Sequence, residues 1–189
     1  MFLKTIILLS SLFLCLVSFA GEVLSENAGG VVLYSTDEPD LAQTDEPSAA
    51  NWQTKAQEVL INALSLTGIK YKYGGSTPAT GFDCSGFVRY VFSQATNLTL
   101  PPTARAIAQI GKTIKRDDLQ PGDLVFFNTL QKAFSHVGIY MGNNKFIHAP
   151  RTGAEVRVES INSSYWASRF ESGQRLDKEV EKSDLKLSK

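Results

Sequence analysis

The chain has 189 residues, of which 43% are hydrophobic and 20% charged, and its formal net charge is zero. This length allows one domain with a hydrophobic core, and the composition is that of a globular protein, not of a disordered or fibrous one. The charge is uneven: residues 21–50 carry seven acids and no Lys or Arg, whereas residues 51–189 carry eighteen Lys and Arg against twelve acids. A mildly basic domain suits an anionic partner such as cell wall or nucleic acid, although the charge can also serve solubility alone.

Residues 1–20 have the pattern of a secretory signal peptide. Lys4 supplies the positive charge of the n-region. Thr5–Leu14 is the apolar h-region, which is too short to span a bilayer. Ser18 and Ala20 place small side chains where a signal peptidase needs them. We therefore expect cleavage near Ala20, export to the periplasm or the medium, and no stable membrane insertion afterwards. An uncleaved membrane anchor is the alternative.

The sequence contains two cysteines, Cys15 and Cys84. Leu14 stands before Cys15, where a lipoprotein signal needs a small side chain, which disfavours acylation of Cys15. Cleavage after Ala20 would leave Cys84 as the only cysteine, so no internal disulfide could form.

Residues 21–50 are acidic, rich in small residues and without helical or strand periodicity, and they predict a disordered acidic linker. The domain is expected over residues 51–176. Its first helix is predicted over Trp52–Thr67 from the spacing of apolar residues along one face, with Gly68 as the C-terminal cap. Residues 177–189 alternate charges and predict a charged flexible tail.

Asp83 is a good N-cap residue and predicts a helix from Cys84 to about Thr96. A short helix is predicted over Ala104–Gly111, and a turn or short helix over Tyr165–Phe170. Four strands are predicted, over Leu124–Phe127, His136–Met141, Lys145–Ala149 and Val156–Val158. The second and third of these strands form a hairpin around residues 142–144.

Cys84 and the only two histidines, His136 and His148, form a candidate catalytic set. A thiol at a helix N-terminus faces unpaired N–H groups, which favour the reactive thiolate. An imidazole can accept its proton and later donate it to a leaving amine. His136 is the better candidate for this base, and His148 would orient its ring. A zinc site and separate structural roles for the three residues are the alternatives.

The catalytic interpretation makes a demand on the hairpin, because side chains alternate between the two faces of a strand. A two-residue turn at residues 143–144 would pair His148 with Ile139 and put His136 on the opposite face. A three-residue loop at residues 142–144 would pair His148 with Gly138, so that both histidines share one face. We therefore predict a loop with an odd number of residues.

Four segments together resemble a known family. They are Tyr71-Lys72-Tyr73-Gly74-Gly75, Phe82-Asp83-Cys84-Ser85-Gly86-Phe87-Val88, Leu119-Gln120-Pro121-Gly122-Asp123-Leu124-Val125-Phe126-Phe127, and His136-Val137-Gly138-Ile139-Tyr140 followed by His148-Ala149. From about Trp52 to Leu176 the chain is similar to the NlpC-type family of bacterial cell-wall cysteine endopeptidases. The resemblance implies an α+β, papain-like fold, in which N-terminal helices including the nucleophile helix pack on a central antiparallel sheet. It also implies cleavage of peptidoglycan stem peptides, most often between D-γ-glutamate and a diamino acid such as meso-diaminopimelate.

By this resemblance, Cys84 is the nucleophile, His136 the general base and acid, and His148 the third, orienting residue. Tyr71 matches the family tyrosine whose hydroxyl helps to hold the oxyanion, and the alternative is an ordinary strand tyrosine with a buried ring. The implied partners are stem peptides and not nucleic acid, with no cofactor or metal, and we expect a monomer.

Asp83 and Ser85 are candidates for binding the free amine of a stem peptide, although Asp83 could serve only as the helix cap. Relatives often carry Arg where this chain has Pro102, and Arg105, one helical turn further on, is the candidate substitute. The alternatives for function are an N-acetylmuramoyl amidase, an acyl transferase with the same Cys-His pair, and a non-catalytic wall-binding domain.

Overall fold

The computed structural model describes residues 49–176 of the chain. The expected signal peptide over residues 1–20, the linker up to residue 48 and the tail over residues 177–189 lie outside the described residues. Among the helices that the structure describes, none has both the length and the apolar character that crossing a membrane requires.

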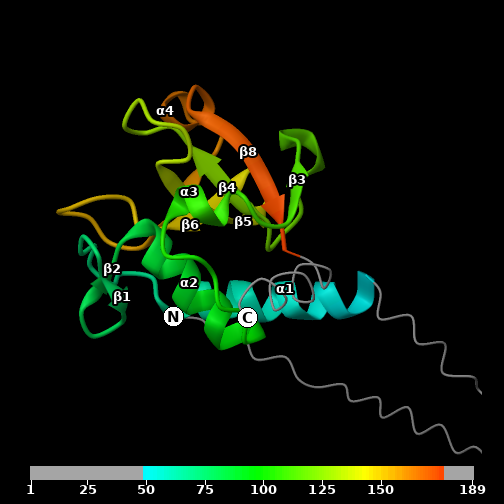
Figure 1. The fold of residues 1–189 in the computed structure, drawn as a ribbon, viewed down its shortest axis with the longest axis horizontal. Coiled ribbons are helices and arrows are strands. Elements are labelled where there is room, and N and C mark those ends of the chain that lie inside the picture. The colour runs from blue at the N-terminus through cyan, green and yellow to red at the C-terminus, as the bar shows by residue number, and fades with distance from the viewer. Residues whose placement is uncertain (1–48, 177–189) are drawn as a thin grey trace, which may run out of the picture. The chain divides into compact units, whose positions relative to one another are not determined.

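Helical segments and strands alternate irregularly along the described chain (Figure 1). The helical segments are α1 (Ala49–Ser65), α2 (Cys84–Thr96), α3 (Ala104–Ile107), the 3₁₀ turn η1 (Arg116–Asp118) and α4 (Ser164–Ala167). The strands are β1 (Ser76–Thr77), β2 (Gly81–Phe82), β3 (Lys112–Ile114), β4 (Leu124–Phe127), β5 (His136–Gly142), β6 (Lys145–His148), β7 (Arg157–Ser160) and β8 (Phe170–Arg175).

Six strands form one sheet in the order β3-β8-β4-β5-β6-β7, and every neighbouring pair is antiparallel. β1 and β2 form a separate two-stranded pair just before α2. The last strand, β8, lies inside the sheet between β3 and β4, so the last residues of the described chain pair with strands from its middle.

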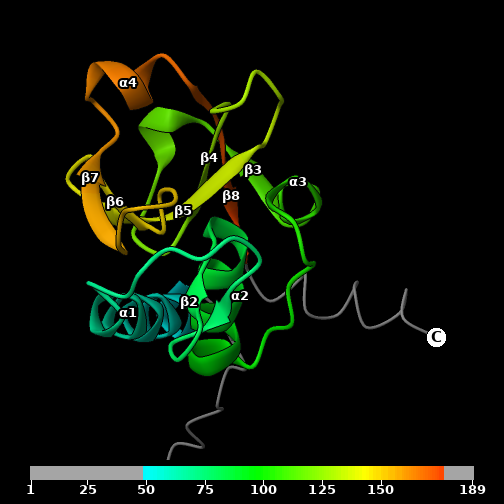
Figure 2. The ribbon, with the colours of Figure 1, turned by 90° about the vertical axis from the view of Figure 1, so that its left-hand side faces the viewer.

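Helices cover the sheet on both sides (Figure 2). α1 and α2 lie side by side against one face, and α4 lies over the opposite face. This arrangement of helices on a mostly antiparallel sheet confirms the expected α+β, papain-like fold, in which the helix beginning at Cys84 packs on the sheet.

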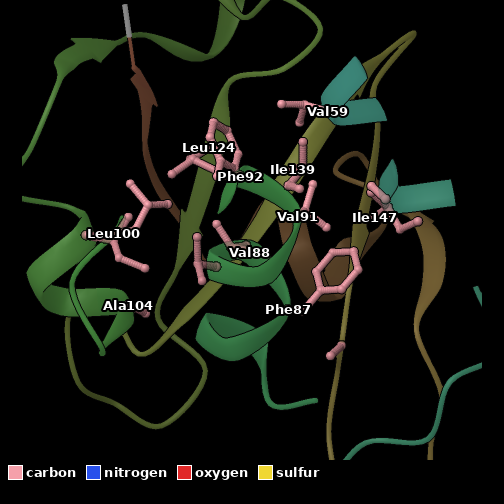
Figure 3. Packing of buried hydrophobic residues seen from close by; sticks show 14 of the residues in the cluster. Val59, Phe87, Val88, Val91, Phe92, Leu100, Ala104, Leu124, Ile139 and Ile147 are labelled. Carbon is pink, nitrogen blue, oxygen red and sulfur yellow. The ribbon is translucent and has the colours of Figure 1, made fainter. Parts of the chain in front are cut away.

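The core has two parts because β4 is buried on both faces. Leu124 and Phe126 point toward α1 and α2, where they join residues such as Val88 (Figure 3). Val125 and Phe127 point to the other face, where they pack with Trp166 of α4. A continuous apolar run in the sequence thus corresponds to a strand covered on both sides.

α2 begins and ends where its capping residues dictate. The Asp83 carboxylate accepts a hydrogen bond from the Gly86 N–H at 2.7 Å, which satisfies one of the free N–H groups of the first turn. Asn97 adopts a left-handed conformation with φ 57° and ends the helix. The predicted bounds of this helix are confirmed.

Other predicted bounds need correction. α1 begins at Ala49 and ends at Ser65, although Gly68 has the positive φ of a helix-terminating residue. α3 ends at Ile107, well before the predicted Gly111. The strand predicted over Val156–Val158 begins one residue later, at Arg157, and runs to Ser160. β3 and β8 had no counterpart in the prediction.

The hairpin of β5 and β6 corrects the prediction on loop length but not on register. Its turn contains only Asn143 and Asn144, both with positive φ, and Gly142 pairs with Lys145. A bulge leaves Met141 without a partner on β6. Because of this extra residue, Ile139 pairs with Ile147, whereas a ladder without a bulge would pair it with His148. The odd residue that the register requires therefore lies in the strand and not in the loop.

Candidate active site

Cys84 is the first residue of α2, directly after the capping Asp83. The loop before the helix packs tightly on this turn: the Asp83 N–H donates to the Gly75 carbonyl at 3.0 Å, and a Cβ on Gly86 would collide with that same carbonyl. Glycine at position 86 therefore allows the loop to hold the start of the helix, and with it the thiol, in a fixed place.

The environment of the Cys84 thiol contains opposing influences. Burial, and then the neighbouring Asp83 carboxylate, raise the pKa of the thiol to about 11. Hydrogen bonds from the backbone N–H groups of Val137, Ser85 and Cys84 lower this pKa but do not outweigh burial. This balance favours the thiol over the thiolate, which differs from the thiolate expected from the helix N-terminus alone. A nucleophilic role for this sulfur would therefore need a base to remove its proton.

His136 is the first residue of β5, and its neighbour Val137 hydrogen-bonds the Cys84 sulfur through its backbone. The Nε2 of His136 lies 2.7 Å from the Nδ1 of His148. We call these two residues the histidine pair. Both side chains are buried, His136 at 4% exposure and His148 at 0%. The contact with His148 occupies the Nε2 of His136 and leaves its Nδ1 available for another partner.

The histidine pair shares one face because of the bulge at Met141. Gly138 faces His148 across the strands, and a Cβ there would lie 3.1 Å from the His148 Cβ and 2.7 Å from the Phe146 ring. The absence of a side chain at position 138 gives the imidazole its space.

Trp166 of α4 packs against the rings of both histidines. It stacks on His136 with ring centroids 5.3 Å apart and meets His148 edge-on at 5.0 Å. Burial lowers the pKa of both histidines below the ordinary value of 6.5. The lowered pKa values favour neutral rings at neutral pH, and a neutral imidazole has a nitrogen lone pair that can accept a proton.

Tyr71 lies beside the thiol in an isolated bridge to Phe82, and its N–H donates to the Ala154 carbonyl at 2.8 Å. Burial, followed by the nearby Cys84 and Asp83, raises the pKa of the Tyr71 phenol. The hydroxyl therefore stays protonated and is able to donate a hydrogen bond to a negative oxygen near Cys84.

Two hollows meet at Cys84, and Tyr71, Leu130 and Ser135 line both of them. We call them the histidine-side hollow, of about 470 Å³, and the helix-side hollow, of about 870 Å³. The first is lined by the site residues His136, Glu159 and Trp166 and by Arg151 and Arg157, among others. The second is lined by Asp83, Ser85 and Arg105, among others. A peptide could therefore extend to both sides of the thiol.

The structure brings the three candidate substrate-binding residues together in the helix-side hollow, and each already has a partner. Besides the cap, the Asp83 carboxylate accepts from the Gly74 N–H at 3.0 Å and from the Ser85 hydroxyl at 3.0 Å. The Arg105 guanidinium donates to the Ala133 carbonyl at 3.2 Å. The capping role of Asp83 is thus a feature of the fold, and substrate contacts would add to it.

A metal site was one alternative for Cys84 and the histidine pair. Within residues 49–176, no group of three or more His, Cys, Asp or Glu side chains is arranged to hold a metal ion. The histidine pair instead uses its facing nitrogens for a hydrogen bond within the pair.

Two further residues of the site were not predicted from the sequence, Glu159 and Trp166. Glu159 lies with its Oε1 3.6 Å from the Nε2 of His148, and the Trp166 indole N–H donates to the same carboxylate. No local signal in the sequence points to Glu159. It shares a face with Arg157, but only the pairing of Arg157 with His148 across the strands brings it close to the histidine pair.

Comparison with known proteins finds a matching family and several similar chains. The model of the NlpC/P60 family matches residues 68–175, more than half of the chain. The murein DD-endopeptidase MepH of Escherichia coli (strain K12) is 40% identical over 126 residues, which are 65% of this chain and 46% of MepH. The gamma-DL-glutamyl hydrolase of Bacillus subtilis (strain 168) is 39% identical over 130 residues, 68% of this chain and 31% of that protein.

A solved structure is also similar. The crystal structure of the NlpC/p60 domain of the peptidoglycan hydrolase SagA matches with a TM-score of 0.57 and 30% identity, over 64% of this chain and 98% of that one. In contrast, this chain covers about half or less of the length of the two curated relatives. The match therefore concerns a domain that those relatives carry within longer chains.

Proposed function

The chain belongs to the NlpC/P60 family, and on this premise we propose that it is a cysteine peptidase that hydrolyses the stem peptides of peptidoglycan. The observation that carries the proposal is a thiol at a helix N-terminus that lines one hollow together with His136, whose ring is hydrogen-bonded to the fully buried His148. This is the arrangement that a nucleophile, a base and an orienting group require.

In the proposed reaction, the Cys84 sulfur attacks an amide carbonyl carbon while its proton moves to the Nδ1 of His136. The Tyr71 hydroxyl and backbone N–H groups at the start of α2 donate to the oxygen that becomes negative. His136 then gives the proton to the leaving amine, and the C–N bond breaks to leave a thioester on Cys84. Water, deprotonated by His136, hydrolyses the thioester and restores the thiol.

We propose that the bond cleaved lies between D-γ-glutamate and the diamino acid, most often meso-diaminopimelate. The support is the similarity to a protein named gamma-DL-glutamyl hydrolase and a helix-side hollow that holds the Asp83 carboxylate for a free amine. Asp83, Ser85 and Arg105 would then bind the part of the stem peptide that precedes the cleaved bond.

A second candidate bond is the D,D cross-link between two stem peptides. It is favoured by the similarity to a protein named murein DD-endopeptidase. In that case, both hollows would hold strands of a cross-linked dimer, one on each side of Cys84.

Export is part of the proposal, because a peptidoglycan substrate lies outside the cytoplasmic membrane. The signal-peptide pattern of residues 1–20 supports it, and the similarity to proteins named for murein is in agreement. We further propose that the protein acts as a monomer without a metal or cofactor.

The test is digestion of purified diaminopimelate-type peptidoglycan, with products identified by mass spectrometry. The protein should release fragments cut between D-γ-glutamate and diaminopimelate, and Cys84→Ala should release none. Fragments from cleaved D,D cross-links would instead support the second candidate. Release of free stem peptides cut from muramic acid would identify an amidase, and no products from any wall type would contradict the peptidase proposal.

A further inference from the structure

Glu159 stands directly behind the histidine pair. β7 pairs with β6 so that Arg157 faces His148 and Glu159 faces Phe146, which places Glu159 diagonally next to His148 on the same face. Its Oε1 lies 3.6 Å from the His148 Nε2, which is close enough for an electrostatic contact and longer than a hydrogen bond. This Nε2 is buried and has no closer hydrogen-bond partner among the described residues.

The positions of the protons on the two rings follow from what each nitrogen must do. To accept the Cys84 proton, the Nδ1 of His136 must carry a lone pair, so its proton sits on Nε2. That Nε2–H donates to the Nδ1 of His148 at 2.7 Å, so His148 must carry its own proton on Nε2. The atom that faces this last proton is the Glu159 carboxylate oxygen. Each of the four ring nitrogens thus has a defined role as proton donor or acceptor, and the Glu159 carboxylate faces the outermost N–H group.

Other contacts fix the Glu159 carboxylate in its place. The Arg157 Nε donates to its Oε1 at 2.5 Å, and the Trp166 indole N–H donates to its Oε2. The contact with His148, then the bonds from Trp166 and Arg157, lower the pKa of Glu159 to about 2 against the opposing effect of burial. Glu159 is therefore charged and oriented throughout the pH range in which an imidazole can act as a base.

We propose that Glu159 is a positioning residue that holds His148, and through it His136, in the tautomer that presents a lone pair to Cys84. It also stabilises the positive charge that His136 gains when it takes the thiol proton. Glu159 does not touch the substrate in this role, and it receives no proton. The kinetic part of this inference rests on the proposed peptidase function, whereas the tautomer and the charge effect do not.

The proposal has a definite consequence for pH dependence. The charged groups that act on the histidine pair are Glu159 and Arg157, and the Cys84 thiol adjoins it from α2. The Glu159 carboxylate raises the pKa of both histidines, against burial. Replacing it with a neutral group therefore lowers these pKa values, and the acid limb of the activity profile moves to lower pH. The maximal kcat on the plateau of this pH profile falls, because the imidazole becomes a weaker base.

The first experiment is nuclear magnetic resonance of the untagged protein with ¹⁵N-labelled histidine, which contains only two histidine rings. Both rings should carry their proton on Nε2 near neutral pH. Glu159→Gln should lower the titration midpoints of the histidines, whereas Glu58→Gln, the same change on the exposed face of α1, should not. A His148 ring protonated on Nδ1, or midpoints unchanged in Glu159→Gln, would overturn the proposal.

The second experiment measures kcat and KM for stem-peptide cleavage across pH. Glu159→Gln should lower kcat by at least about 10-fold with little change in KM, and its acid limb should move to lower pH. If Glu159 only supported the fold, kcat would fall without movement of the limb, and this result would contradict the proposal. If no variant cleaves peptidoglycan but the resonance results hold, the proposed function fails and the positioning role of Glu159 stands.

Discussion

The chemistry of the site depends on a balance at Cys84 between burial and the helix N-terminus. Backbone N–H groups at the start of α2 stabilise a negative sulfur, yet burial and Asp83 outweigh them. In the mechanism we propose, His136 therefore removes the thiol proton as a general base, because this pKa disfavours a resting ion pair of Cys84 thiolate and His136 imidazolium. The proposed mechanism thus depends on the arrangement of the histidine pair.

This balance predicts how the thiol reacts with an alkylating agent. Because burial raises the pKa of Cys84 to about 11, iodoacetamide should modify it slowly at neutral pH and faster as the pH rises toward that value. The rate is measured from the mass of the peptide that contains Cys84, so that Cys15 does not interfere. A midpoint below 9.0, the ordinary value for a thiol, would contradict this account.

Single residues with local signals were predictable, and residues that act through pairing were not. Asp83 caps α2 because a carboxylate at that position bonds the next turn, which the sequence alone reveals. The importance of Glu159 depends on which strand lies beside β6 and in what register, and such long-range pairing leaves no mark in a local pattern.

At the scale of elements, the hairpin of β5 and β6 decides whether the histidines meet. The shared face of the two histidines was predictable from chemistry, because a triad demands it. The bulge at Met141 that achieves it was not, because a two-residue turn with a bulge and a three-residue loop give the same register downstream.

Gly138→Ala tests this element directly. The added methyl would meet the Phe146 ring and the His148 Cβ, so it should displace the His148 ring and destabilise the fold by about 1–3 kcal/mol. A small displacement of catalytic groups should lower kcat/KM by about 100-fold. Activity assays and urea unfolding of the same samples separate the two effects. Unchanged activity in a folded variant would show that the space at Gly138 does not position His148.

Across the whole molecule, one buried ion pair links the end of the described chain to its centre. Asp123, at 0% exposure, receives two hydrogen bonds of 2.8 Å from the guanidinium of Arg175 on β8. It also accepts from the Gln120 N–H at 2.8 Å, which fixes the turn before β4. β8 was not predicted because its sequence, Phe-Glu-Ser-Gly-Gln-Arg, lacks apolar alternation, and its place is set by contacts with distant strands.

Removal of one partner of this pair should weaken the fold without changing the chemistry. Asp123→Ala leaves the Arg175 charge poorly compensated and should lower the free energy of unfolding by about 3–5 kcal/mol. Asp117→Ala, at an exposed position in η1, is the matched control and should change it little. Urea unfolding gives both values. A loss below about 1 kcal/mol for Asp123→Ala would contradict a structural role for the pair.

In the reaction that we propose, Cys84 forms a covalent thioester with the acyl part of a stem peptide. The most direct measurement is the intact mass of the protein after reaction with L-Ala-γ-D-Glu-diaminopimelate peptide and rapid quenching in acid. We expect the protein to gain the mass of one L-Ala-γ-D-Glu acyl group, located on the peptide that contains Cys84, and we expect no such gain in Cys84→Ala. Cleavage of the peptide by the Cys84→Ala variant, or an acyl group attached to another residue, would contradict it.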